Sequence, residues 1–217
     1  MLLYSDAEST EQPTNPIWFV HPQLHQEVDV VAIPFTAPEV AKIYPINTMN
    51  TVPDLRLIAG GDVFVLGYPK GTSGGGLFPI WKRASLATEP QLDLNGSPMM
   101  LVDTATREGM SGGPVIAVAT GGYTTESNNT VLGQDGTRFA GINSGRLGTN
   151  ELEAQLGVVW KAKVLDEMID AAQTGTSVFY GPLGSEEIAR GKRLPPRPFR
   201  GRRLTFTWVL VALLAVN

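Results

Sequence analysis

The sequence contains no cysteine and only two histidines, His21 and His25. Without cysteine there are no disulfides, thiolate metal sites, iron–sulfur clusters or cysteine nucleophiles. Two histidines with no cysteine also argue against a zinc site, and nothing in the sequence calls for another metal or a cofactor. The scarcity of histidine matters for hydrolytic chemistry, because histidine is the commonest general base in enzymes.

Basic residues are scarce in the first 189 positions, which hold 10 of them against 21 acidic residues, for a net charge of −11. The other seven basic residues lie between Arg190 and Arg203 and give this segment +7. An acidic body argues against a nucleic-acid partner. At 42% hydrophobic and 18% charged, the 217 residues are able to bury a core, so disorder is not the expected state of the chain.

Short apolar segments rich in β-branched residues recur along the chain, with turn residues between them. The predicted strands cover residues 17–20, 28–35, 40–46, 63–68, 80–87, 99–104, 114–119, 139–142 and 156–160. Residues 121–136 are predicted to form a long polar hairpin loop. Residues 162–173 form the one clear helix, because Val164, Leu165, Met168 and Ile169 share a face. Since helices do not alternate with the strands, the pattern predicts an all-β barrel or sandwich.

Ser111 lies in the most informative segment, DTATREGMSGGPV at residues 103–115. Glycines on both sides of it let the backbone turn tightly around the hydroxyl. The amides of Gly109 and Ser111 can then point into one small space and form an oxyanion hole, of which one donor is typically worth about 3–4 kcal/mol of barrier. The alternative is a Gly-Gly-Pro turn that carries an incidental serine.

The pattern Gly-x-Ser-x-Gly at residues 109–113 also fits the nucleophile elbow of α/β-hydrolases. That elbow requires a helix directly after the serine and a histidine later in the chain. Here a strand is predicted at 114–119, and no histidine follows Ser111. An α/β-hydrolase esterase is therefore disfavoured.

The sequence GMSGGPV at residues 109–115 resembles the nucleophile motif of trypsin-like (chymotrypsin-fold) serine peptidases, most closely their cysteine-free bacterial branch. VDVVAI at 28–33 resembles the acid strand of the family, and FAGINSG at 139–145 resembles the strand that lines the substrate cleft. GVVW at 157–160, with the helix after it, resembles the end of the second barrel. The resemblance covers roughly residues 17–173.

The resemblance implies a two-barrel, all-β fold with a C-terminal helix. Residues 1–59 would form an incomplete N-terminal barrel, and residues 60–175 the second barrel with its closing helix. The implied activity is that of a serine endopeptidase, with a polypeptide substrate and an acyl-enzyme intermediate. Ser111 would be the nucleophile, Asp29 the orienting acid, and the amides of Gly109 and Ser111 the oxyanion hole.

The resemblance also indicates where the substrate would bind. Ala105, six residues before Ser111, corresponds to the floor of the primary pocket, so small or apolar side chains are expected there. Asn143, Ser144 and Gly145 would bind the substrate backbone as an added strand, through main-chain hydrogen bonds.

The general base of the family, a histidine that precedes the acid in the chain, has no counterpart here. His25 lies four residues before Asp29, about 13 Å along a strand, whereas a hydrogen bond needs about 3 Å. His21 is eight residues away and ends a predicted strand. Residues 1–50 also supply about three strands where six are expected, so the chain is expected to be incomplete at its N-terminus relative to the family. We therefore expect a poor peptidase, with a non-catalytic peptide-binding module as the alternative.

The C-terminal part has a different composition. Residues 176–203 are basic and proline-rich, which predicts a linker. Leu204 to Val216 carries no charge over 13 residues, a helix length of about 20 Å against about 30 Å of hydrocarbon. It is either part of a membrane anchor or an apolar end that packs on the barrel or stays disordered. A bacterial protein of the cytoplasm or the membrane surface is favoured, and no oligomeric state is indicated.

Overall fold

The computed structural model describes residues 18–25, 27–35, 45–46, 51–76, 78–147 and 156–175, together with the backbone of 210–214. The elements are β1 (Val31–Phe35), β2 (Asp62–Gly67), the 3-10 helix η2 (Pro69–Gly71), β3 (Ile80–Leu86), β4 (Met99–Asp103), β5 (Pro114–Ala119), β6 (Gly122–Thr124), β7 (Thr130–Leu132), β8 (Gly136–Arg146), β9 (Leu156–Lys161), α1 (Ala162–Ala171) and β10 (Leu210–Leu214). The predicted all-β class is confirmed.

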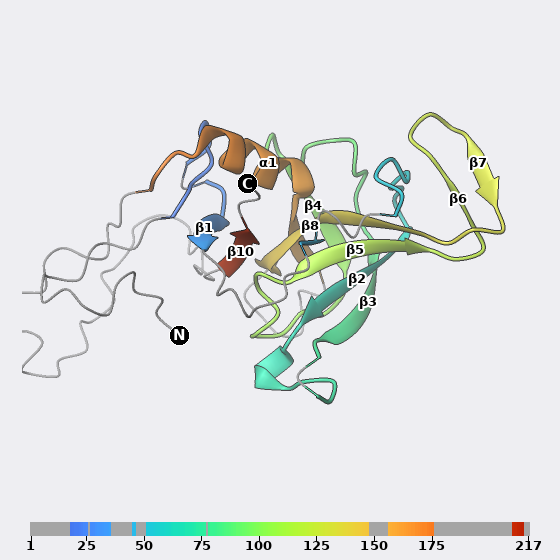
Figure 1. The fold of residues 1–217 in the computed structure, drawn as a ribbon, viewed down its shortest axis with the longest axis horizontal. Helices are drawn as coiled ribbons and strands as arrows, with labels where there is room; N and C mark the ends of the chain where they lie inside the picture. The colour runs from blue at the N-terminus through green and yellow to red at the C-terminus, as the bar shows by residue number, and fades with distance from the viewer. Residues whose placement is uncertain are drawn as a thin grey trace, which may run out of the picture.

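Six antiparallel strands close into a barrel in the order β2-β3-β4-β9-β8-β5 (Figure 1). Strands β2, β3 and β4 follow one another, and β5 returns to pair with β2, which is the 4-1-2-3 order of a Greek key. The long strand β8 and strand β9 then fill the gap between β5 and β4. Closure leaves every barrel strand paired on both sides, so no exposed edge remains.

Alternation of side chains along the strands fills the barrel interior. Val63 and Val65 of β2 are fully buried, whereas Asp62 is exposed and Phe64 lies on the outside against Trp81 of β3. Val102 of β4 is buried in the same way. Each such side chain contributes about 1.5–3 kcal/mol relative to full exposure, which makes this core the main source of stability of the barrel.

A second core lies outside the barrel. Residues Val28, Val30 and Ala32 of the N-terminal segment pack there with α1 and with the outward-facing side chains of β8 and β9. The side chains that meet them from the barrel and the helix are Phe139, Ile142, Trp160, Val164, Leu165 and Met168. The N-terminal segment and the helix therefore hold each other against one side of the barrel (Figure 1).

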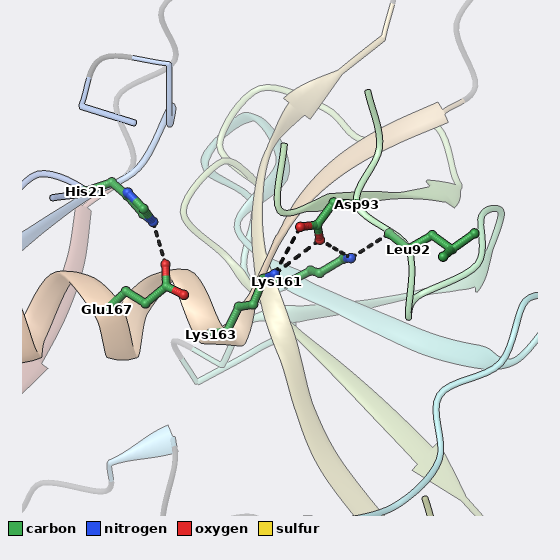
Figure 2. A network of polar contacts seen from close by, with 6 residues as sticks. All are labelled: His21, Leu92, Asp93, Lys161, Lys163 and Glu167. Atoms are coloured by element: carbon green, nitrogen blue, oxygen red, sulfur yellow. Dashed lines mark hydrogen bonds and ion pairs between the residues drawn. The ribbon is translucent and has the colours of Figure 1, made fainter. Parts of the chain in front are cut away.

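Asp93 ties the loop before β4 to the junction of β9 and α1. Lys161 Nζ donates to Asp93 Oδ1 at 2.7 Å and to the Leu92 carbonyl at 2.6 Å, and Lys163 approaches the same carboxylate at 3.1 Å (Figure 2). The hydrogen bond from Lys161, more than any other contact, lowers the pKa of Asp93. The carboxylate thus stays ionised between two cations and fixes the start of the helix.

Two secondary-structure predictions and one predicted buried residue need correction. The polar loop predicted at 121–136 contains a two-stranded ribbon, β6 with β7, which projects from the barrel at the right of Figure 1. Of the strand predicted at 17–20, the described residues 18–20 form only isolated bridges, from Phe19 to Ala32 and to Thr174. Ile169 is 41% exposed, because it falls one residue past Met168, about 100° further around the helix and outside its buried face.

The first and last parts of the chain are described only partly. In residues 18–25, 27–35, 45–46 and 51–59, β1 is the one strand, and the strand predicted at 40–46 lies mostly outside the described residues. The linker predicted at 176–203 also lies outside them. In the apolar segment predicted at 204–216, Leu210–Leu214 form β10, which pairs with β1 in parallel. Among the described residues, no helix has both the length and the apolar character needed to cross a membrane.

Helix α1 offers a direct test of the outer core. Met168 is fully buried in that core, whereas its neighbour Ile169 is 41% exposed. Met168→Ala is expected to lower the free energy of unfolding by about 2–5 kcal/mol, through lost burial and the cavity left behind. Ile169→Ala, the matched control, should change it by less than about 1 kcal/mol. Denaturant titration measures both, and equal losses would mean that α1 does not pack as described.

Candidate active site

Ser111 lies on a loop made of two consecutive tight turns between β4 and β5, which we call the serine loop (residues 104–113). The Met110 amide donates to the Arg107 carbonyl at 3.1 Å, and the Gly113 amide donates to the Met110 carbonyl at 3.0 Å. The third residue of each turn is a glycine with positive φ, +87° at Gly109 and +84° at Gly112, as type II turns require. Ser111 occupies the second position of the second turn, where its side chain is half-buried.

Hydrogen bonds to two carbonyls set the orientation of the peptide groups around Ser111. The Glu108 carbonyl accepts from the Lys70 amide at 2.7 Å, and the Met110 carbonyl accepts from Asn143 Nδ2 at 3.0 Å as well as from Gly113. In a trans peptide the N–H points opposite to the carbonyl, and the described chain has no cis peptide bond. The N–H groups of Gly109 and Ser111 are therefore turned away from these partners.

Neither of these two amides donates a hydrogen bond to another group in the described part of the chain. Unpaired backbone donors are uncommon in folded proteins unless solvent or a ligand meets them. Here both donors belong to the serine loop, one to Ser111 itself and the other to Gly109, two residues earlier. The arrangement can hold a negatively charged oxygen next to Ser111 Oγ.

Gly109 also meets a steric requirement. A Cβ at this position would collide with the carbonyl oxygen of Tyr68, whose amide donates to the Gly109 carbonyl at 3.0 Å. Together with the positive φ, this close approach leaves room only for glycine. The segment after β2, Tyr68 to Lys70, is thereby fixed against one side of the serine loop.

Asn143 of β8 holds the other side of the serine loop. Its amide donates to the Gly113 carbonyl at 2.9 Å, and its carbonyl accepts from the Gly112 amide at 2.7 Å. Its side chain is fully buried, and because a carbonyl only accepts, the atom that faces Met110 must be Nδ2. Asn143 Oδ1 is left as a buried acceptor without a partner among the described residues.

These hydrogen bonds argue against the predicted role of Asn143 in binding a substrate strand through its main chain. Its main-chain groups are already paired with the serine loop, so they are not free for an added strand. Ser144 is buried, and its Oγ accepts from Trp160 Nε1 at 3.1 Å. The register of β8 against β9 shifts between Asn143 and Gly145, which makes Ser144 the extra residue of a bulge. Gly145 is half-buried, and its carbonyl accepts from Thr106 Oγ1 at 3.4 Å.

Ala105, the predicted pocket floor, lies half-buried at the start of the serine loop. Its carbonyl accepts a hydrogen bond from Lys82 Nζ of β3. Burial, and then the charge of nearby Arg107, lowers the pKa of Lys82. Sequence reasoning missed both cations, because Lys82 comes from a strand more than twenty residues away and only the barrel brings it to the loop.

Asp29, the predicted orienting acid, lies just before β1 and is half-buried. Its neighbours Val28 and Val30 both point into the outer core, so the aspartate side chain, between them in an extended segment, faces the other way. Burial raises the pKa of Asp29 to about 7. No hydrogen bond or ion pair links its carboxyl to another described residue, Ser111 included.

Both histidines are engaged away from Ser111 and Asp29. His21 is buried, and its Nε2 lies 2.6 Å from Glu167 Oε2 of α1 (Figure 2). The amides of Gln23 and Leu24 donate to His21 Nδ1, so the neutral ring carries its proton on Nε2 and donates it to Glu167. His25 is exposed, with Nδ1 at 3.3 Å from Gln173 Nε2. Neither ring has a nitrogen bonded to the serine or the aspartate.

Comparisons with protein-family models, with curated protein sequences and with solved structures find no match to this chain.

The close approach at Gly109 can be tested against a glycine with open space around it. Gly133 also has a positive φ, +76°, but a Cβ there would meet nothing within 4 Å. Gly133→Ala should cost only the backbone strain, about 1–2 kcal/mol. Gly109→Ala should cost at least about 1 kcal/mol more, because the Tyr68 carbonyl must also move. Denaturant titration of both variants gives the difference, and equal costs would contradict the packing described for the serine loop.

The environment of Asp29 predicts a pH dependence of stability. Its pKa is about 7 in the folded chain and about 3.9 in the unfolded one, so between these values the folded state binds more protons. The stability due to Asp29 is thus fully present below about pH 4 and is lost as the pH rises to about 7. Asp29→Asn should remove this component and be the more stable protein at pH 8.

Denaturant titrations at pH 5 and pH 8 measure the effect. Asp62 provides the control, because a hydrogen bond from Arg83 lowers its pKa and its contribution is lost at low pH instead. Asp62→Asn should therefore not gain stability at pH 8. If Asp29→Asn shows the same pH profile as the parent chain, the carboxyl of Asp29 is not desolvated.

Proposed function

We propose that this chain belongs to the trypsin-like serine endopeptidases and carries their acyl-transfer nucleophile at Ser111. One observation carries the proposal: Ser111 lies beside two backbone amides, its own and that of Gly109, which have no acceptor in the described part of the chain. Hydrogen bonds to the carbonyls of Glu108 and Met110 hold these amides in place. A preformed pair of donors is what an acyl-transfer site needs, since no reorganisation is required as charge develops.

The architecture supports the proposal at a coarser level. A closed Greek-key barrel carries the serine loop between β4 and β5, and strand β5 follows the loop directly, which argues against the nucleophile elbow of α/β-hydrolases. The helix α1 follows the last barrel strand, as in the family. The two-barrel architecture, with Asp29 contributed by the first barrel, is part of the proposal.

The chemistry would begin with attack of Ser111 Oγ on the carbonyl carbon of a peptide bond. The hydroxyl proton passes to a base, and the carbonyl oxygen becomes an oxyanion that accepts from the Gly109 and Ser111 amides. The C–N bond then breaks, the amine leaves with the proton, and water hydrolyses the resulting ester. Each oxyanion donor is typically worth about 10²–10³ in rate.

The rate of the proposed reaction depends on which group accepts the proton of the Ser111 hydroxyl, and neither histidine is bonded to Ser111. His21 bonds to Glu167 and two backbone amides, and His25 lies beside Gln173. Loss of the histidine from a catalytic triad typically costs about 10⁶-fold in kcat. The proposal therefore includes a very low peptidase rate for this sequence.

A second candidate function is a non-catalytic peptide-binding module. The observation in its favour is that both histidines are engaged elsewhere, while the Asp29 carboxyl has no partner among the described residues. A molecule that has lost its base keeps the barrel and the serine loop and can still bind an extended peptide. The two candidates differ in whether the Ser111 hydroxyl reacts.

A serine-directed fluorophosphonate distinguishes them. The full-length chain is incubated with the probe, and mass spectrometry locates the label. We expect slow labelling confined to Ser111, because the amide pair stabilises the tetrahedral phosphonyl oxygen even when the base is missing. Ser111→Ala should abolish it, whereas the control Ser127→Ala, on the β6–β7 ribbon, should leave it unchanged.

Rapid labelling of Ser111 would show that a base is present and would overturn the claim of low activity. Labelling of Ser111 no faster than of other serines would reject the nucleophile. If such a chain still binds peptides, the binding module is the function, and if it binds none, both candidates fail.

A further inference from the structure

The basic residues of the described segments differ in how they are paired. Arg83, Arg138, Lys161 and Lys163 each form an ion pair with a carboxylate. Five others form none, namely Arg56, Lys70, Lys82, Arg107 and Arg146, although acidic residues outnumber basic ones two to one in the first 189 positions. Of these five, Lys82 is the one that is partly buried, whereas the other four are exposed.

Lys82 and Arg107 both belong to the candidate site. Lys82 extends from β3 and donates to the carbonyl of Ala105, the residue predicted to form the floor of the primary pocket. Arg107 lies two residues further along the serine loop. The contact with Ala105 places the Lys82 ammonium beside the segment that carries Arg107, and the charge of Arg107 helps to lower the pKa of Lys82. Thr106, between Ala105 and Arg107, is turned toward Gly145 of the predicted substrate strand.

The nearest acidic residues in sequence do not neutralise this pair. Asp103 ends β4, and Glu108 follows Arg107, and both side chains are exposed. Neither forms an ion pair with Lys82 or Arg107. Two like charges held close together repel, so an anion placed between them gains from both. A partly buried site strengthens the attraction, because water screens it less.

We propose that Lys82 and Arg107 form a subsite for a carboxylate, so that the preferred polypeptide substrate places a glutamate or aspartate side chain beside Ala105. This inference rests on the proposed function and names its substrate class. It replaces the expectation of small or apolar side chains, which depended only on the absence of a carboxylate at position 105. The Arg107 guanidinium offers a planar pair of donors to a carboxylate, and the Lys82 ammonium offers a point charge.

A set of four peptides tests the subsite with the full-length chain. They are fluorescein-labelled octapeptide amides that differ only at the fourth residue, which is Glu, Gln, Lys or Leu, and fluorescence anisotropy gives their affinities. We expect the Glu peptide to bind roughly tenfold more tightly than the isosteric Gln peptide, and the Lys peptide to bind worst. The Glu-to-Gln ratio should fall as salt rises from 20 to 500 mM, because ions screen the exposed Arg107 charge.

Substitutions then assign the preference to the two cations. Lys82→Met and Arg107→Gln should each reduce the Glu-to-Gln ratio several-fold, and Arg107→Glu should move the preference toward the Lys peptide. Lys163→Gln is the control, because Lys163 pairs with Asp93 away from the serine loop and should leave the ratio unchanged. Thermal melts check folding, and if Lys82→Met does not fold, the two variants of the exposed Arg107 decide the matter.

The outcomes separate this inference from the proposed function. Equal binding of the Glu and Gln peptides, or a preference that survives at Arg107→Gln and Arg107→Glu, overturns the carboxylate subsite. Absence of binding by all four peptides overturns it as well. In each case the labelling of Ser111 by the fluorophosphonate still decides the nucleophile independently, since that probe carries no carboxylate.

Discussion

The orientation of the candidate site depends on hydrogen bonds to two backbone carbonyls, those of Glu108 and Met110. The Lys70 amide binds the Glu108 carbonyl, and Asn143 Nδ2 binds the Met110 carbonyl. Because each peptide group is rigid, fixing its carbonyl also fixes the N–H on its other side. The donors of Gly109 and Ser111 are therefore oriented by groups that lie outside the serine loop. The barrel supplies both holding groups, one from the segment after β2 and one from β8.

The N-terminal segment is attached to the barrel through a different set of forces. Val28, Val30 and Ala32 bury their side chains against α1 and β8, and His21 adds a short hydrogen bond to Glu167. This attachment places Asp29 on the opposite face of the segment, where burial without a partner raises its pKa. Ionisation of such a carboxyl lowers the free energy of unfolding, so Asp29 does not stabilise the fold at neutral pH and above. Shifted pKa values of this kind cluster at functional sites.

Much of the barrel could be predicted from the sequence, because the signals there are local. The alternating β-branched residues of 63–66 and the apolar run of 99–102 predict two strands, and the apolar spacing of Val164, Leu165 and Met168 predicts the helix. The turn at Ser111 was also predictable, since glycines at positions 109 and 112 allow the positive φ values that it uses. The strand predicted at 114–119, on which the argument against an α/β-hydrolase elbow depends, is present as β5.

The remaining features depend on contacts between distant residues, for which the sequence carries no local signal. Nothing near Asn143 indicates that its amide holds the Met110 carbonyl, 33 positions away. Lys82 likewise reads as an ordinary strand residue until the barrel carries it to Ala105. The short strands β6 and β7 were read as loop, because polar ribbons at the surface lack the burial pattern on which strand prediction relies. Long-range side-chain contacts of this kind appear only once the fold is known.

The position of Trp160 makes its fluorescence emission sensitive to the bulge in β8. Its indole is buried among the side chains of the outer core, while its Nε1 donates to Ser144 in the bulge of β8, one residue after Asn143. Trp81, in contrast, is 55% exposed on the surface of the barrel. The emission of Trp160 should therefore lie further to the blue than that of Trp81, and it should shift when the bulge moves. In a variant whose other three tryptophans are replaced by phenylalanine, intrinsic fluorescence would therefore report on the strand that orients the serine loop without any added label.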